Sequence, residues 1–187
     1  MNESSITPEK NIPVLSLRNF VLFPGQALPI WISSEQSRKA VDAAISADGW
    51  MFVVKSRNPK KPDSRDDFYS TGVLAKIQKL KRGKEDDYQL LLNSFDRFEV
   101  ESFTEAHGFW VASGARRRDI DDTSSATRRA LEDSLRETAS EILKLVPSDT
   151  SRLESAVAAI KESDTLLFTL AQYLDIAIEK KIELLSE

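Results

Sequence analysis

The stretch that decides the fold runs from Ile12 to Gly25 and reads IPVLSLRNFVLFPG. Its first six residues form a short, mostly apolar run, which is typical of a buried strand. Pro24 and Gly25 stand in the order that a type II turn requires, because proline presets φ at the first central position and glycine accepts a positive φ at the second. The stretch therefore predicts a strand over 12–17, followed by a tight turn.

Strand and turn signals continue up to about residue 115. We expect a strand over 27–32, then a helix to about residue 47 that Ser33 or Ser34 caps. The apolar stripe of this helix consists of Ala40, Val41, Ala44 and Ile45. A polar loop is expected over 56–67. Further strands are expected over 50–54, 71–80 and 88–92, in a separate stretch over 95–100, and over 109–115.

The pattern changes near Arg118, where a polar, acidic segment leads into helical periodicity. Apolar residues recur there at spacings of three and four, until Pro147 stops the first helix: Leu131, Leu135, Ala139, Ile142 and Val146. Asp149 and Ser163 are expected to cap a second and a third helix, and a fourth lies over about 178–185. These patterns predict an α+β protein with two packed subdomains, 1–118 and 119–187.

Composition narrows the class of protein. The 187 residues are 41% hydrophobic and carry a net charge of −4, whereas dedicated nucleic-acid binders are more often basic. There is no cysteine, which excludes disulfides, thiolate metal sites and cysteine nucleophiles. Residues 1–11 lack the layout of a signal peptide, and no apolar run approaches the roughly 20 residues that span a bilayer. We therefore expect a cytoplasmic protein that does not enter a membrane.

Residue types that carry chemistry are present but not arranged for it. His107, the single histidine, precedes Gly108 and is expected in a turn, and one histidine without partners does not make a zinc site. The many aspartates lie in polar segments where burial does not separate their pKa values. A basic group consists of Lys79, Lys81, Arg82, Lys84 and Arg116–Arg118. We interpret it as a solvated strand end that nearby carboxylates partly neutralise. No catalytic, metal-binding or cofactor-binding residue is predicted.

Four segments, taken in order, resemble the N-terminal domain of Lon-type ATP-dependent proteases. Residues 12–25 resemble that family's opening stretch, which is close to PVLPLRDVVVFPG, and residues 69–77 (YSTGVLAKI) resemble its YxVGTVARI strand. Residues 91–98 are similar to the strand pair VEGLxRxRI, and residues 179–187 (EKKIELLSE) to a helix containing EKQELLE. Ser16 and Ser94 depart from the family pattern, which has proline and glycine there. The resemblance spans about residues 12–187.

This resemblance implies a PUA-like β pseudobarrel followed by a C-terminal α-helical bundle. It also implies a non-catalytic domain for substrate recognition and assembly, which engages unfolded or degron-bearing proteins. In the family, a homohexamer passes them to an ATPase that uses ATP and Mg²⁺ and to a serine–lysine peptidase. Neither motor nor peptidase motif occurs in these 187 residues, since no G-x-x-x-x-G-K-[ST] loop is present. We therefore expect no enzyme activity and no cofactor in this chain.

A domain that grips unfolded segments needs some exposed apolar surface. Phe20 and Leu22, beside the Pro24–Gly25 turn, and Trp31, at the junction of strand and helix, are the candidate substrate-binding residues. The alternative is a stand-alone PUA-like protein that binds RNA or a small ligand. Its support is the basic group, and the acidic net charge counts against it.

Overall fold

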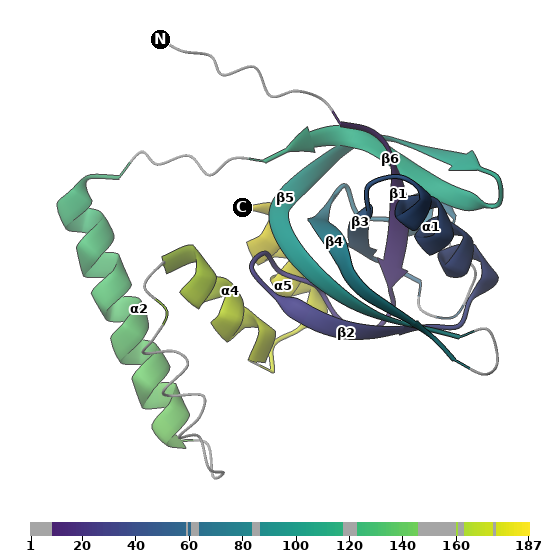
Figure 1. Cartoon of the computed structure of the whole chain (residues 1–187). Coiled ribbons are helices and arrows are strands. Elements are labelled where there is room, and N and C mark those ends of the chain that lie inside the picture. Colours follow the sequence, from purple (N-terminus) through teal and green to yellow (C-terminus); the bar gives the residue numbers. More distant parts are fainter. Residues whose placement is uncertain are drawn as a thin grey trace. The chain divides into compact units, whose positions relative to one another are not determined.

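The computed structural model (Figure 1) describes residues 9–58, 60, 64–83, 87–117, 123–145, 160, 163–173 and 175–187. The chain divides into two compact units. One contains residues 1–118 together with 176–187, and the other contains residues 119–175.

The first unit is built on one six-stranded sheet that closes on itself (Figure 1). Its order is β2-β5-β4-β3-β1-β6, and an additional pairing between β5 and β6 joins β5, β4, β3, β1 and β6 into a ring. β1 runs parallel to β3 and the remaining pairs are antiparallel. The strands are β1 (Glu9–Leu17), β2 (Ala27–Ile32), β3 (Trp50–Lys55), β4 (Thr71–Arg82), β5 (Tyr88–Ala106) and β6 (Phe109–Arg116).

β5 is a single strand of 19 residues, where the sequence predicted two separate stretches. One of its edges pairs with β4 over residues 88–99. The other edge pairs first with β2 over 88–93 and then with β6 over 98–106. Register shifts interrupt the β4–β5 and β5–β6 ladders, and such bulges bend a strand. The sheet therefore curls far enough for β5 to meet β6.

Between β2 and β3, helix α1 (Glu35–Ser46) packs against the ring, and β1 supplies most of its contacts. Ser34 caps it, because the Ser34 hydroxyl accepts a hydrogen bond from the Ser37 N–H at 3.2 Å. Ala40, Val41 and Ala44 have no exposed surface, as the predicted stripe requires. Ile45 is 44% exposed, so its assignment to that stripe was wrong. It lies one residue past Ala44, which turns it about 100° away from the buried face.

The core fills the ring with large side chains. Phe52 and Phe98 are fully buried, and their ring centroids lie 5.4 Å apart. Gly72 on β4 lies directly against Phe52, because a Cβ at residue 72 would come within 2.6 Å of that ring. Phe23, within the stretch 12–25 that decides the fold, is also fully buried. The turn after it has the expected geometry, with Gly25 at φ +76°.

The last helix belongs to the β-rich unit and not to the helical one. α5 (Ile178–Ser186) contacts β4 and buries Ile182 and Leu185. Arg97 on β5, itself buried, donates a hydrogen bond from Nη1 to the Leu185 carbonyl at 3.3 Å. A cation at a helix C-terminus satisfies the last carbonyls and opposes the helix dipole. The predicted second subdomain, 119–187, therefore differs from the structure over its final twelve residues.

The second unit contains α2 (Ser125–Leu145) and α4 (Ser163–Tyr173). Ala139 and Leu166 are buried there, and Leu135, Ile160 and Leu170 pack around them. Leu131 is 61% exposed, so it lies outside this small core despite its spacing. Val146, Pro147, the helix that Asp149 was expected to cap and the side chain of Ile142 lie outside the described residues.

Ring closure is expected to be sensitive to the close approach of β5 and β6 at Gly114. A Cβ at this position would come within 2.0 Å of the Glu99 carbonyl oxygen, which is backbone and has no flexible end to move. Gly114→Ala should therefore destabilise the fold by about 1–3 kcal/mol or more, measured by urea unfolding. Ser102→Ala, on the exposed part of β5, is the matched control and should change stability by less than about 0.5 kcal/mol. Equal stability of both variants would contradict tight closure.

Candidate functional site

The most exposed large apolar side chain of the described residues is Trp31, at 70%. Its strand, β2, alternates in burial: Ile30 and Ile32 face the core, while Ala27, Pro29 and Trp31 face outward. Because strand side chains alternate between faces, the two buried isoleucines force Trp31 into solvent. The segment ALPIWI also contains no charged residue. β2 therefore presents an uncharged strip whose most prominent group is an indole.

Cross-strand neighbours extend this surface. Trp31 pairs with Gln89 on β5, which pairs with Lys81 on β4, and all three residues share one face. In the next row, Leu91 lies between Pro29 and Lys79 in the same way. We call the outward-facing set of Pro29, Trp31 and Leu91 the β2 surface. It is apolar over β2 and the adjacent part of β5, and two lysines of β4 border it.

The other two predicted binding residues differ from Trp31. Phe20 is half-buried, and Leu22 is only 3% exposed. The segment that carries them is held down after Leu22, because the Ser94 hydroxyl donates to the Phe23 carbonyl at 2.6 Å. Leu22 therefore belongs to the core and offers no surface to a partner in this conformation. Its burial gives no support to the expectation that it binds substrate, and the roles of Leu22, Trp31 and Phe20 all remain predictions.

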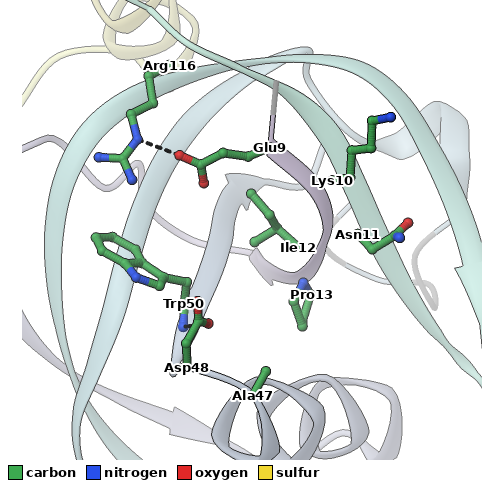
Figure 2. Close-up of a pocket in the computed structure, with 9 residues that line it drawn as sticks. All are labelled: Glu9, Lys10, Asn11, Ile12, Pro13, Ala47, Asp48, Trp50 and Arg116. Carbon is green, nitrogen blue, oxygen red and sulfur yellow. Dashed lines mark hydrogen bonds and ion pairs between the residues drawn. The ribbon is translucent and has the colours of Figure 1, made fainter. Parts of the chain in front are cut away.

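A pocket of about 470 Å³ with both polar and apolar lining residues lies where β1, the end of α1, β3 and β6 meet (Figure 2). Arg116 dominates its wall: Nε donates to Glu9 at 2.6 Å and Nη1 to Asp96 at 2.5 Å. These carboxylates raise the pKa of the Arg116 guanidinium above its usual value, with the Glu9 hydrogen bond as the largest cause. The guanidinium also lies 5.3 Å from the centroid of the Trp50 ring.

The pocket has the composition of a structural ion-pair network. Of the two carboxylates that line it, Glu9 binds the Arg116 guanidinium and Asp48 accepts a hydrogen bond from the Trp50 N–H at 3.3 Å. Trp50 is flanked further by Phe95, with ring centroids 5.2 Å apart, and by the Lys76 ammonium at 5.5 Å. The sequence alone did not predict this cluster, because its members come from five strands. No signal within any one of them points to the others.

His107 and the basic group fit the structural positions that the sequence predicted for them. His107 and Gly108 have φ values of +54° and +81° and form the two-residue turn between β5 and β6, so the predicted turn position is confirmed. Among the described residues, no three His, Cys, Asp or Glu side chains gather as a metal site. Within the basic group, Arg117 lies 3.5 Å from Glu99 and Arg82 lies 3.8 Å from Asp42. Carboxylates thus accompany several of its cations.

Comparison with known proteins identifies the family of this chain. A family described as the substrate-binding domain of ATP-dependent protease La (LON) matches residues 11–187. The chain belongs to this Lon substrate-binding domain family. The match covers both compact units and nearly all of the residues described above.

Relatives of the Lon domain occur within much longer proteins. Lon protease 1 of Bdellovibrio bacteriovorus is 29% identical over 93% of this chain, and the matched part is 22% of that protein. The Lon protease of Paraburkholderia phytofirmans is 31% identical over 97% of the chain and 23% of its own length. The chain thus spans about a fifth of the length of the relatives it matches.

Two solved structures share the α+β fold. The N-terminal domain of a Mycobacterium avium complex Lon protease superposes with a TM-score of 0.74 at 19% identity, covering 95% of this chain and 90% of that one. A Lon N-terminal domain protein from Xanthomonas campestris gives 0.58 at 17% identity, covering 97% and 91%. At these identities the likeness establishes the fold alone. No described helix is long and apolar enough to cross a membrane.

A hydrogen bond between Tyr88 and Asp42 holds the start of β5, the partner strand of β2, against α1. The Tyr88 hydroxyl, at the start of β5, donates to Asp42 of α1, at 3.0 Å from Oδ1 and 3.1 Å from Oδ2. Burial, and after it the hydrogen bond to Asp42, raises the pKa of the Tyr88 phenol above its usual value of 10.0. The neutral phenol therefore favours the folded chain.

Because of this hydrogen bond, the stability difference between the parent and a variant without the Tyr88 hydroxyl should depend on pH in the alkaline range. A raised folded-state pKa contributes stability that is fully present below the unfolded pKa and is lost as pH rises through the folded pKa. Tyr88→Phe should therefore be less stable than the parent near neutral pH, and the gap should narrow above about pH 10. Urea unfolding midpoints across that range provide the measurement. Tyr69→Phe, at a half-buried tyrosine whose ring contacts Arg57, is measured alongside as the control. A gap that stays constant with pH would contradict this assignment.

Proposed function

We propose that this chain is the substrate-recognition and assembly domain of an ATP-dependent Lon serine protease. In this proposal it binds unfolded or degron-bearing proteins and catalyses nothing itself. The ring and α5 form a PUA-like pseudobarrel, and the second unit provides the helical bundle. Segments outside this chain supply the ATPase, with ATP and Mg²⁺, and the serine–lysine peptidase. The whole protein is proposed to work in the cytoplasm as a homohexamer.

The observation that carries the proposal is the β2 surface within a member of this family. A tryptophan that is 70% exposed on an uncharged strand loses little by leaving water for a partner's apolar side chain. Indole side chains also supply much of the binding energy at protein interfaces. Folded proteins bury most of their large apolar groups, so such a surface favours chains that have lost their fold.

Weak single contacts suffice in this mechanism. When several copies of the domain surround one substrate, each further contact is intramolecular and benefits from a high effective concentration. Overall affinity then rises by orders of magnitude without any new type of contact. A surface with few specific polar groups therefore serves many sequences, and a folded protein with only one apolar patch is released.

RNA binding, the alternative, is disfavoured by the ion pairs of two arginines in the basic group. Phosphate recognition needs cations that are free to exchange counterions for phosphates. Arg116 instead lies between Glu9 and Asp96, and Arg117 lies beside Glu99. A titration with single-stranded RNA at low salt separates the two functions. We expect no salt-dependent binding.

Loss of the indole should weaken capture of unfolded chains while leaving the fold intact. We expect Trp31→Ala to lower the affinity for a reduced, carboxymethylated model protein by about tenfold or more, because interfacial tryptophans often contribute at least 2 kcal/mol. Photo-crosslinking and fluorescence anisotropy measure the loss, and an unchanged urea midpoint verifies folding. Ile45→Ala, an exposed apolar residue on α1, is the matched control. Equal capture by Trp31→Ala and the parent would remove Trp31 from the binding surface.

A further inference from the structure

The open edge of β2 indicates how a substrate segment binds. Each ring strand pairs along two edges, whereas β2 pairs only with β5 among the described strands. Exposed edges of soluble proteins are usually protected by charged side chains, bulges or prolines, since unpaired main-chain groups attract other strands. β2 has no charged residue and no register shift, and Pro29 is its only such feature.

A main-chain hydrogen bond next to β2 determines which main-chain groups face this edge. Ser94 N donates to the Gln26 carbonyl at 2.8 Å, so Gln26 and Ser94 form a hydrogen-bonded pair of the antiparallel ladder. Such pairs alternate along the ladder, and the β2–β5 register runs without a shift over residues 27–32. Leu28, Ile30 and Ile32 therefore direct their main-chain groups toward β5. Ala27, Pro29 and Trp31 direct theirs to the open edge.

The position of Pro29 agrees with this alternation of main-chain groups. Proline has no N–H and is tolerated in a strand where that group would face away from the ladder. The open edge thus offers the N–H and C=O of Ala27, the C=O of Pro29, and the N–H and C=O of Trp31. These groups lie on the strand that also carries the exposed indole. Hydrogen bonds to the main chain read no side chain, which suits a partner of variable sequence.

We propose that an extended segment of an unfolded polypeptide binds as an added strand along the open edge of β2, with an apolar side chain against Trp31. This rests on the proposed function and specifies its binding mode. The size of the edge favours this occupant over a second copy of the chain. Six residues span about 20 Å, and with a sheet about 10 Å thick the contact covers roughly 200 Å² per chain. A stable interface buries about 800 Å² per partner.

The first test uses synthetic ten-residue peptides of alternating valine and threonine with an acidic residue at each end. One form is unmodified, one carries three N-methyl groups on residues of the same parity, and one carries three on residues of mixed parity. Same-parity methylation leaves one edge of the peptide intact, whereas mixed parity blocks both. We expect the first two peptides to bind the 187-residue chain alike and the third to bind at least about tenfold more weakly, since each lost hydrogen bond costs roughly two- to tenfold.

Variants of the chain test the same edge from the protein side. Pro29→Ala restores an outward N–H and should tighten binding of the unmodified peptide about three- to tenfold. Ala27→Pro removes an outward N–H without touching the ladder to β5 and should weaken binding by a similar factor. Leu91→Ala, which trims the β2 surface but removes no edge group, serves as the side-chain control and should leave the ranking of the three peptides unchanged.

The outcomes separate the two proposals. Equal binding of all three peptides, with no gain in Pro29→Ala, would overturn strand addition while leaving substrate capture through side chains in place. No binding of the unmodified peptide or of the carboxymethylated model protein would overturn both. Sedimentation that shows a dimer of the free chain, abolished by Ala27→Pro, would assign the edge to a second copy and overturn the peptide proposal.

Discussion

The pairing of β5 along both of its edges is the constraint on which the rest of this structure depends. One edge accepts β4, and the other accepts β2 and then β6, so a single 19-residue strand joins both ends of the sheet. Closure needs bends, which the bulges provide, and close approach, which the missing side chain of Gly114 permits. The buried aromatic core, the seat of α1 and the docking of α5 all use the curved wall that results.

Closure also determines where a binding surface is possible. Each of the five strands in the ring has two neighbouring strands. β2 lies outside the ring and pairs with the part of β5 that β6 does not reach. A strand held on one side by a rigid barrel keeps its other side in a fixed, extended geometry. The ion pairs around Arg116 and the hydrogen bonds of Tyr88 stabilise the same frame and supply no reactive group.

Local signals were predicted well because their causes are local. The Pro24–Gly25 turn, the Ser34 cap and the turn at His107 each depend on a few consecutive residues. Trp31 was also chosen from sequence, and alternation along ALPIWI explains why it is exposed. The α+β class followed from the change of periodicity near residue 118, and the resemblance to Lon domains added the identity of the family.

Features that depend on distant partners could not be predicted in this way. Leu22 is buried because Ser94, far along the chain, holds the next residue against the ring. The last helix joins the β-rich unit because Arg97 and β4 receive it, although its own sequence resembles that of the helices before it. The sequence predicted two stretches because the polar residues Asn93 and Ser94 separate 88–92 from 95–100, and only the pairing on both sides shows that the strand continues.

Hydrogen exchange of the free chain tests the central claim most directly. If β5 closes the ring and leaves β2 with one open edge, amides in the segments that pair on both sides should exchange only through global unfolding. These segments are residues 73–76 of β4, 88–93 of β5 and 111–114 of β6. Within β2, the amides of Ile30 and Ile32 should be protected while those of Ala27 and Trp31 exchange at nearly the rate of an unstructured peptide. Uniform protection along β2, or fast exchange at the contact between β5 and β6, would contradict the account.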